Sequence, residues 1–384
     1  MNVKQVYELV NNATNEVLGT EQLLQEDLSN VVDVGTEIFN NNAFDNYVKT
    51  LINHIGRVIF VNRPYRGSAP SVLMDGWEYG SVMQKIQAEL PEATETEDWL
   101  LTNGTSYDPN IFHKPKASSK FFNKRTTFEI DRSITEMQVK ESFSSPEQLN
   151  AFISMLFNEV DKSLTVKTDA LVMRTINNFI GATFYEDFPT GNYSDNTTAR
   201  CVNLLKLYND KFSKTLTPET ALYDVDFIRF ASMEMSLYYD RLGKISKLFN
   251  IGGMPRFTTP DLLHFVMLND FQKSANVYLQ SDTFHNEYTK LPNAESVPYW
   301  QGSGLEYSFG DISEINVTTA DGHNVHVSGI LGVMFDRDAL GVANVNKRVT
   351  TNYNPKGEFT NYFYKQDAMY FNDYNENFVV FYIA

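Results

Sequence analysis

The chain has 384 residues, one cysteine and a formal net charge of -16. This length allows one large hydrophobic core or two moderate ones. A lone cysteine excludes an internal disulfide, which fits assembly in a reducing compartment. The acidic balance argues against a free nucleic-acid binder, which would normally present a basic face. An acidic wall could still enclose DNA without adhering to it, although solubility is the simpler explanation of the charge.

Neither a secretory leader nor a membrane anchor is predicted. The start, MNVKQVYELVNNAT, lacks a basic patch followed by an apolar block. No apolar run reaches the roughly 20 residues that a membrane-spanning helix needs. The chain has 28 Phe and 21 Tyr, and this aromatic share suits both cores and permanent interfaces.

The first 132 residues divide into a polar start and a hairpin-like segment. Residues 1–56 are rich in Asn, Asp and Glu, and they fit either an arm that lies on a neighbouring subunit or the edge of a packed subdomain. In residues 57–132, strand-like VIFV is followed by several Pro and Gly residues, which suits an extended hairpin. The hairpin residues that we expect at contacts between subunits are Gly67, Asp75, Gly76, Trp77 and Tyr79.

Two stretches of opposite charge follow this hairpin. The acidic stretch contains Glu92 and Glu95, and the basic stretch contains Lys116, Lys120 and Lys124. Both are either solvated surface or charges that fix the register of one subunit against the next. We include these five residues among the candidate contacts between subunits.

Residues 133–181 contain the clearest predicted helix. Ser145 can cap it, Pro146 suits its first position, and Gln148 would complete a capping box. Apolar residues then recur at helical spacing as far as Phe179, and the helix is expected to end at Gly181. About 35 residues would span roughly 50 Å. A helix of this length with one apolar stripe is expected to lie across a broad sheet or along another subunit.

Residues 182–304 are predicted to form an inserted α/β segment. Helices are expected over residues 198–214 and 224–250, the second ending at Gly252-Gly253. The continuous apolar run LLHFVML, residues 262–268, predicts a buried strand. A helical rhythm then resumes over residues 271–279.

Residues 305–384 are predicted to be β-structure. INVTTADGHNVHV alternates on both sides of an Asp-Gly turn, which indicates a hairpin over residues 315–327. From Gly332 onward apolar and polar residues alternate, with a turn signal at Asn354-Pro355. The ending FVVFYIA is too apolar for water and is expected inside a sheet. One domain would therefore be built from segments on both sides of the insertion.

The histidines do not form a convincing metal site. His323 and His326 are three residues apart on a predicted strand, so their side chains would point to opposite faces. Surface positions on the hairpin are the better interpretation. His264 lies in the apolar run and is expected to be a hydrogen-bonded core residue. We predict no metal and no cofactor.

No catalytic motif is recognisable in the sequence. Neither G-x-S-x-G nor a phosphate-binding Gly-Lys-Ser/Thr loop occurs. Asp336 and Asp338 could share a strand face, but they adjoin a turn and are expected to be an exposed charge cluster. Cys201 has apolar neighbours at helical spacing and is expected in a helix core, without a catalytic role. We predict that the protein is not an enzyme.

Several separated blocks resemble the major capsid proteins of small short-tailed bacteriophages of the phi-29-like group. RVIFVNRPYRGSAPSVLMDGWEYGSVMQKI is similar to the extended loop of that family. PNIFHKPKASSKFFNKRTTFEI, leading into SPEQLNAFISML, is similar to the segment before its spine helix. FDRDALGV, NPKGEFTNYFYKQDAM and NENFVVFYIA resemble its C-terminal strands, and NPKGEFTNYFY is the most specific block. Between residues 182 and 304 only the spacing of helix-like and strand-like segments is similar, and no sequence block matches.

The resemblance implies an α+β fold of the Hong Kong 97 type. That fold has an N-terminal arm, an extended β-hairpin loop, a peripheral domain with a long spine helix on a β-sheet, and an inserted α/β axial domain. The matching ranges would be 1–56 for the arm, 57–132 for the loop and lead-in strands, 133–181 for the spine helix, 182–304 for the axial domain, and 305–384 for the return strands. Some relatives append an immunoglobulin-like domain, which we do not expect after Ala384. The Lys–Asn–Glu trio of cross-linked shells cannot be placed, so a non-covalent shell is expected.

The resemblance also implies a function. The chain would be a major capsid protein in the virion of a podovirus, assembled in the bacterial cytoplasm into an icosahedral head around double-stranded DNA. Its partners would be copies of itself in hexamers and pentamers, a scaffolding protein and a portal, with no sequence-specific DNA binding and no membrane. Two alternatives remain open from the residues alone. These are a soluble enzyme acting on polysaccharide, and another virion component such as a tail protein.

Overall fold

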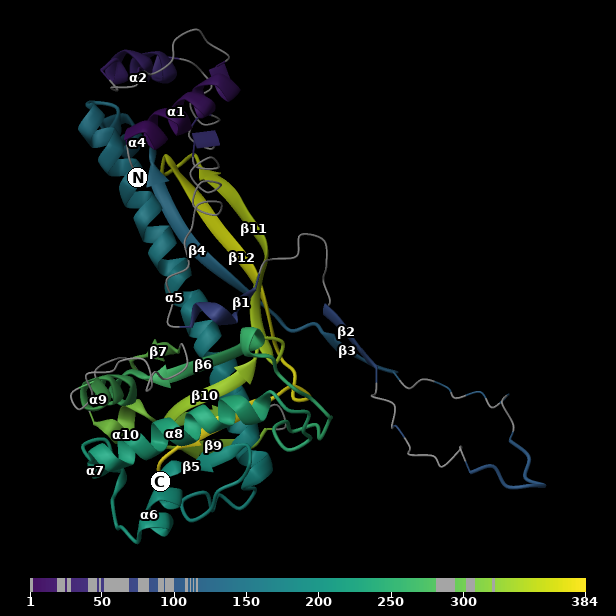
Figure 1. The fold of residues 1–384 in the computed structure, drawn as a ribbon. Coiled ribbons are helices and arrows are strands. Elements are labelled where there is room, and N and C mark those ends of the chain that lie inside the picture. Colours follow the sequence, from purple (N-terminus) through teal and green to yellow (C-terminus); the bar gives the residue numbers. More distant parts are fainter. Residues whose placement is uncertain are drawn as a thin grey trace. The chain divides into compact units, whose positions relative to one another are not determined.

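The computed structural model describes residues 3–18, 25, 29–40, 47, 50–51, 69–74, 83–88, 93, 100–107, 110, 112, 114, 117–280, 294–301, 308–319 and 322–384. The chain divides into two compact units, which we treat separately (Figure 1). The main unit comprises residues 1–78 and 125–384, and the hairpin unit comprises residues 79–124.

The described residues form both helices and strands, which confirms the predicted α+β class. The helices are α1 (Val3–Leu18), α2 (Val31–Asn40), α4 (Glu136–Ser142), α5 (Pro146–Asp187), α6 (Leu204–Phe212), α7 (Pro218–Ala221), α8 (Val225–Leu242), α9 (Asn269–Gln280) and α10 (Phe309–Ile312), with short 3-10 turns at Pro70–Val72 and Pro260–Leu262. The strands are β1 (Leu73–Met74), β2 (Met83–Ala88), β3 (Ala117–Phe122), β4 (Arg125–Thr135), β5 (Cys201–Asn203), β6 (Leu263–Leu268), β7 (Glu295–Val297), β8 (Ile315–Thr318), β9 (Asn324–Val327), β10 (Ile330–Asp336), β11 (Leu340–Asn354), β12 (Phe359–Asn372) and β13 (Phe378–Tyr382).

Helix α5 is the long helix that the apolar spacing predicts, and it has 42 residues. Ser145 caps it by accepting a hydrogen bond from the backbone N–H of Gln148 at 3.2 Å, and Pro146 occupies the first position. The predicted capping box forms only in part, because the Gln148 side chain accepts a hydrogen bond from Ser144 instead. At about 1.5 Å per residue the helix spans roughly 60 Å, and Figure 1 shows it running along the main unit.

The first half of α5 packs against a four-stranded sheet of order β1-β11-β12-β4. Leu149 and Ile153 lie in one buried cluster with Tyr362 and Tyr364 of β12. Residues of α1 and α2, among them Val10 and Val34, complete this cluster within the same subunit. Strands β11 and β12 form one long antiparallel hairpin. Its turn lies at the predicted Asn354-Pro355 position, where the Asn354 side chain accepts hydrogen bonds from the next two available N–H groups, those of Lys356 and Gly357, at 3.0 and 3.1 Å.

The second half of α5 packs against a five-stranded sheet of order β5-β13-β10-β6-β7. Every residue of β13 is buried, so the prediction that FVVFYIA lies inside a sheet is confirmed. Side chains alternate along β13. Phe378, Val380 and Tyr382 therefore join α5 in one buried cluster, whereas Val379 and Phe381 join residues of α6, α8 and α9 in another. The sheet is thus covered on both faces.

Two predicted helices in residues 182–304 are wrong in their bounds. Cys201 lies in β5, because Cys201–Asn203 pairs in parallel with β13, and this long-range pairing overrides the helical spacing of its neighbours. Helix α8 ends at Leu242 and does not reach Asn250. The chain beyond it instead forms a two-stranded bridge at Ser246 and Arg256. The predicted strand in LLHFVML, the helix over residues 271–279 and the hairpin over 315–327 are confirmed as β6, α9 and β8–β9.

Asp367 of β12 links three strands on the sheet face opposite the α5 side. It accepts a hydrogen bond from Thr127 Oγ1 of β4 at 2.7 Å and pairs with Arg348 of β11. Burial acts to raise the pKa of Asp367, but the hydrogen bonds from Arg348 and Thr127 outweigh it and hold that pKa below its ordinary value.

We therefore expect Asp367 to stabilise the fold above the ordinary aspartate pKa, near 4. A depressed folded-state pKa means that this contribution is lost as pH falls below about 4 and through the folded-state value. Urea unfolding of Asp367→Asn at pH 7 and pH 3 checks this. The variant should lose more free energy of unfolding at pH 7 than at pH 3. An equal loss at both pH values would contradict the assignment.

Candidate functional site

Two of the candidate contact residues, Lys120 and Lys124, lie in the described part of the hairpin unit. Strands β2 and β3 pair in antiparallel fashion and place Lys85 directly opposite Lys120. Residues opposite each other in this way have Cβ atoms about 4.5–5.5 Å apart, so the two lysines lie side by side on one face of the hairpin. Lys124 follows β3 and is exposed. Lys85 could not be recognised from the sequence, because its position opposite Lys120 depends on the strand register.

The remaining candidate residues lie outside the described part of the chain. These are Gly67, Asp75, Gly76, Trp77, Tyr79, Glu92, Glu95 and Lys116. Their role between subunits stays a prediction.

The hairpin unit exposes large apolar side chains that the sequence analysis did not single out. Ile86 of β2 is 69% exposed and Phe121 of β3 is 62% exposed. Gln84 opposes Phe121 and Ile86 opposes Ser119, so Ile86 and Phe121 are diagonal neighbours on one face of the hairpin. None of the described residues in 79–124 with an assigned burial is buried. The unit therefore has no core of its own among them, and its apolar face is available to another surface.

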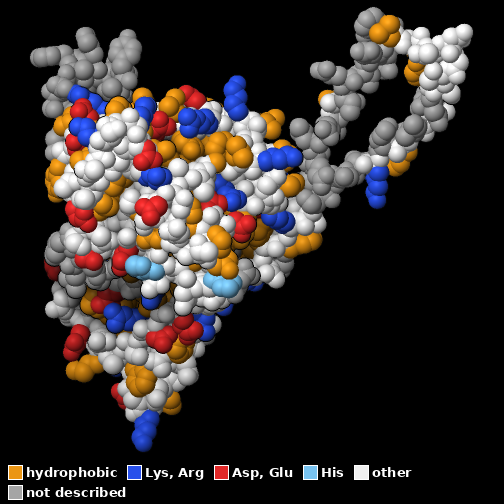
Figure 2. Space-filling model, turned by 90° about the horizontal axis from the view of Figure 1, so that it is seen from below, with side chains coloured by type: hydrophobic (Ala, Val, Ile, Leu, Met, Phe, Trp, Pro, Cys, Tyr) orange, Lys and Arg blue, Asp and Glu red, His pale blue; other side chains and the backbone are white. Residues whose placement is uncertain are grey.

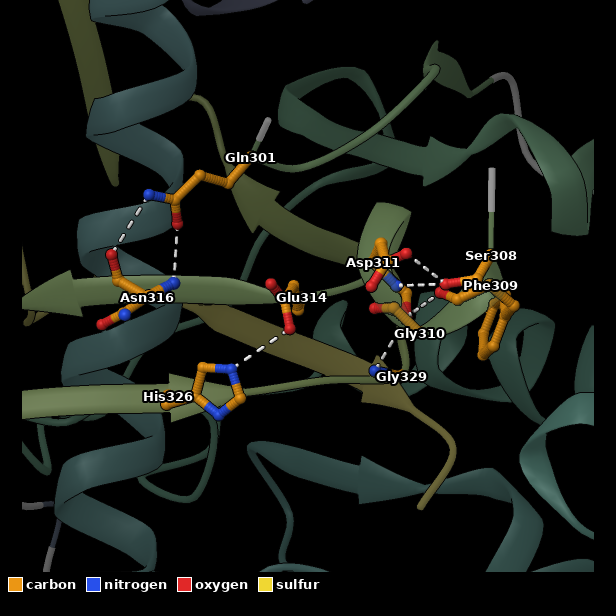
Figure 3. A network of polar contacts seen from close by, with 10 residues as sticks. Gln301, Ser308, Phe309, Gly310, Asp311, Glu314, Asn316, His326 and Gly329 are labelled. Carbon is orange, nitrogen blue, oxygen red and sulfur yellow. Dashed lines mark hydrogen bonds and ion pairs between the residues drawn. The ribbon is translucent and has the colours of Figure 1, made fainter. Parts of the chain in front are cut away.

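The histidines of the β8–β9 hairpin point to separate partners. His323 stacks on Tyr185 of α5, with ring centroids 4.4 Å apart. His326 Nε2 lies 3.1 Å from a carboxylate oxygen of Glu314 (Figure 3). Among the described residues, no group of three or more His, Cys, Asp or Glu side chains could hold a metal ion.

His264 of β6 is not the hydrogen-bonded core residue that the sequence suggests. Its Nε2 is buried and has no hydrogen-bond partner among the described residues. Burial disfavours the imidazolium and lowers the pKa of His264. The ring lies beside Phe335, with centroids 5.9 Å apart, because β6 pairs with β10 at this point.

The prediction of an exposed Asp336–Asp338 cluster is wrong for Asp336. This carboxylate is buried and accepts hydrogen bonds from Thr258 Oγ1 at 2.7 Å and from the backbone N–H of Asp338 at 2.9 Å. Asp336 ends β10 and so fixes the following turn in place. Both oxygens of the Asp336 carboxylate therefore accept hydrogen bonds that stabilise the fold, since a buried carboxylate must be hydrogen-bonded.

Cys201 is buried beside an internal ion pair between Asp187, the last residue of α5, and Arg200. Burial, together with the charge of Asp187, raises the pKa of the Cys201 thiol. A buried thiol in this state is a poor nucleophile. The group therefore has a structural role at the end of α5.

The surface carries charges of both signs. On the face drawn in Figure 2, Lys and Arg side chains lie among Asp and Glu side chains and hydrophobic ones. Within the described part of the chain, no helix is long and apolar enough to cross a membrane.

The described residues thus combine a long helix packed along two sheets with a hairpin unit that exposes an apolar face. The chain belongs to the family of Phi29-like phage major capsid proteins, whose family model matches residues 9–382. It is thus a structural capsid protein of a bacteriophage, a component of the virion, and a subunit of a shell of many copies. The predicted fold of the Hong Kong 97 type is confirmed with the family.

Solved phage structures are similar to this chain at low sequence identity. The capsid structure of Staphylococcus phage Andhra has 9% identity and a TM-score of 0.48, with 84% of this chain and 85% of that chain covered. A structure of the head fiber and inner core protein of bacteriophage P68 has 8% identity and a TM-score of 0.49, with 82% and 83% covered. The capsid structure of cyanophage P-SCSP1u has 12% identity and a TM-score of 0.44, with 84% and 88% covered. No curated protein matches the chain.

Proposed function

We propose that the hairpin unit of each subunit docks on a neighbouring copy and thereby builds an icosahedral shell of hexamers and pentamers. The observation that carries this proposal is the apolar face of Ile86 and Phe121 on a unit without buried described residues. Such a face gains stability only when a second surface covers it. Closed symmetry repeats the same contact at every subunit, and permanent interfaces of this kind often exceed about 2,000 Å².

The charges of the chain fit this role. A net charge of -16 disfavours tight adhesion to DNA, so the shell encloses double-stranded DNA without reading its sequence. The shell is assembled in the bacterial cytoplasm around a scaffolding protein and a portal. The single, buried cysteine agrees with a non-covalent shell in a reducing compartment.

The basic residues of the hairpin unit provide a test of how neighbouring copies dock. Lys85 and Lys120 stand opposite each other, and Lys124 follows them on the exposed surface. We propose that the acidic stretch with Glu92, Glu95 and Glu97 of a neighbouring copy lies against these basic residues.

Reversing the charge of Lys116, Lys120 and Lys124 to Glu should prevent shell formation, because it places like charges across every copy of the contact. Reversing Glu92, Glu95 and Glu97 to Lys in the same chain should restore it. Particles are counted by electron microscopy after expression with the other head-assembly genes of the phage. Lys→Arg at the same three positions is the matched control and should form normal shells. Failure of the sixfold variant to recover shells would count against this pairing.

A further inference from the structure

A segment of the main unit combines basic charge with exposed apolar side chains. We call residues 241–257 the basic knob, and their sequence is RLGKISKLFNIGGMPRF. The segment contains Arg241, Lys244, Lys247 and Arg256 and no acidic residue, although acidic residues outnumber basic ones in the chain, 48 to 32. This concentration of positive charge is therefore a local departure from the composition of the protein.

The backbone of the basic knob holds its apolar side chains outward. Ser246 and Arg256 exchange two backbone hydrogen bonds of 2.9 and 3.0 Å. The Arg256 side chain turns inward, where its Nε lies 3.3 Å from Glu376. The neighbouring pair, Ile245 and Phe257, must point to the opposite face of this ribbon, and both are more than half exposed, at 57% and 53%. Leu248 is exposed beside them.

A hollow with a mixed lining of aromatic, aliphatic and polar side chains lies elsewhere on the same unit. It has a volume of about 380 Å³ and lies between the end of α5, the loop that follows it, and the β8–β9 hairpin. Its lining includes Phe184, Phe188 and Tyr193, together with the stacked Tyr185–His323 pair. An engineered apolar cavity of about 150 Å³ is large enough for benzene. The hollow can therefore take two side chains of the size of Leu248 and Phe257.

Polar contacts hold the segments that carry the lining residues. Glu314 is paired with His326, and Gln301 bonds the backbone of Asn316 through both its amide nitrogen and its amide oxygen, at 3.2 and 2.6 Å (Figure 3). On the other side, the Tyr382 hydroxyl oxygen lies 2.8 Å from the backbone carbonyl oxygens of both Tyr193 and Asn196, which share its single proton. A preformed hollow loses little conformational entropy when it is filled.

The segments around the hollow have the opposite charge bias to the basic knob. Residues 182–199 and 308–327 contain no Lys or Arg. They contain the acidic residues Glu186, Asp187, Asp195, Asp311, Glu314 and Asp321, of which Asp187 is paired with Arg200 and Glu314 with His326. Glu186 and Asp195 are exposed and flank the lining residues Tyr185 and Tyr193 in sequence. The two surfaces are therefore complementary in charge as well as in polarity.

A subunit cannot place its own basic knob in its own hollow. The knob is joined to the start of β13, where the backbone N–H of Phe378 donates to Phe249 at 2.8 Å. The hollow lies at the other end of β13, where the Phe184 and Tyr382 rings are 5.0 Å apart. β13 has five residues, and the four steps of about 3.4 Å between its ends keep the two surfaces roughly 14 Å apart.

We infer that the basic knob of one copy occupies the hollow of the next copy, head to tail, with Ile245, Leu248 and Phe257 facing the aromatic lining. A contact between two different surfaces of the same chain generates a ring when the rotation closes. We assign a second copy of the chain as the occupant, because its basic knob has the opposite charge to the segments around the hollow. This inference rests on the proposed function, because it describes a contact within the shell.

Disulfide trapping tests the contact directly. Leu248→Cys and Asn324→Cys, combined in the full chain, place one thiol on the basic knob and one at the hollow, while the native Cys201 stays buried. Particles made with the other head-assembly genes of the phage are oxidised and run on a non-reducing gel. We expect a ladder of oligomers beyond the dimer, because each copy offers both thiols to different neighbours. Each single variant, and Leu248→Cys combined with Lys162→Cys on the exposed side of α5, should give no ladder.

Charge exchange gives an independent readout. Lys244→Glu with Lys247→Glu should lower the yield of particles at least about tenfold, because like charges then meet at the hollow. Adding Glu186→Lys and Asp195→Lys should restore the yield. Normal particles that give no ladder of cross-linked oligomers would overturn this contact. So would a normal yield from the Lys244→Glu, Lys247→Glu variant, or a cross-link to a different head protein. Each of these results would leave the proposed shell intact. If the wild-type chain forms no particles, both proposals fail.

Discussion

Replacing Ile86 and Phe121 of the hairpin unit by aspartate should leave a folded subunit that no longer forms shells. Both side chains are largely exposed in the subunit, and changes at such positions usually alter the free energy of unfolding by less than about 0.5 kcal/mol. In the proposed shell the same positions are covered by a neighbour, and burying an unpaired carboxylate there would cost several kcal/mol at each contact. Because every subunit repeats the contact, the yield of closed shells should fall to background.

The measurement is electron microscopy of particles, combined with circular dichroism of the soluble variant. Ile86→Val with Phe121→Leu is the control, because it keeps the face apolar and should retain shells. An aspartate double variant that forms normal shells would show that this face is not an interface. Loss of helical signal would instead show that the two side chains support the fold of the subunit, which would also contradict the proposed role.

Phe378→Ala should destabilise the subunit by about 3–5 kcal/mol, the usual loss for a large aromatic in a core. Phe378 begins β13 and is fully buried, and it stacks on Phe179 of α5 with ring centroids 4.0 Å apart. On its other side the Phe335 ring of β10 lies 5.9 Å away. The side chain thus joins the spine helix to the five-stranded sheet, and its removal leaves a cavity between them.

The free energy of unfolding is measured with urea in the background of the two aspartate substitutions, so that assembly does not contribute. Phe112→Ala is the matched control. Phe112 of the hairpin unit is 84% exposed, so the same change of side chain should cost less than about 0.5 kcal/mol there. Similar losses for the two variants would contradict the central packing position of Phe378.

Features with a local physical signal could be predicted from the sequence. The cap at Ser145 and the apolar spacing beyond it predict α5, which continues eight residues past Phe179 to Asp187. The Asp321-Gly322 turn between alternating residues predicts β8 and β9. The apolar ending predicts a buried final strand. In each case the local pattern and the tertiary environment favour the same structure.

Features that depend on distant pairing could not be predicted. Cys201 is extended because it pairs with Val380, far away in the chain, and no local pattern encodes that pairing. Asp336 is buried because Thr258 meets it from another segment. A charged residue beside a turn is more often exposed, so the sequence alone favours the wrong environment.

The candidate contact surface was predictable only in part. Charge runs can be read from sequence, and Lys120 and Lys124 were found in this way. The register that places Lys85 opposite Lys120 is set by strand pairing, and so is the diagonal contact of Ile86 with Phe121. A single exposed apolar residue is ordinary in any protein. Ile86 and Phe121 become candidates for an interface only because they share one face of a unit that has no buried residue among those described.

The most direct test of the central claim is a cryo-electron microscopy map of shells made by this chain. We expect closed shells in which the hairpin unit of every subunit lies on a neighbouring subunit, with Ile86 and Phe121 covered by that neighbour. A map in which the hairpin unit folds back on its own subunit, with these two side chains away from every other copy, would contradict the account.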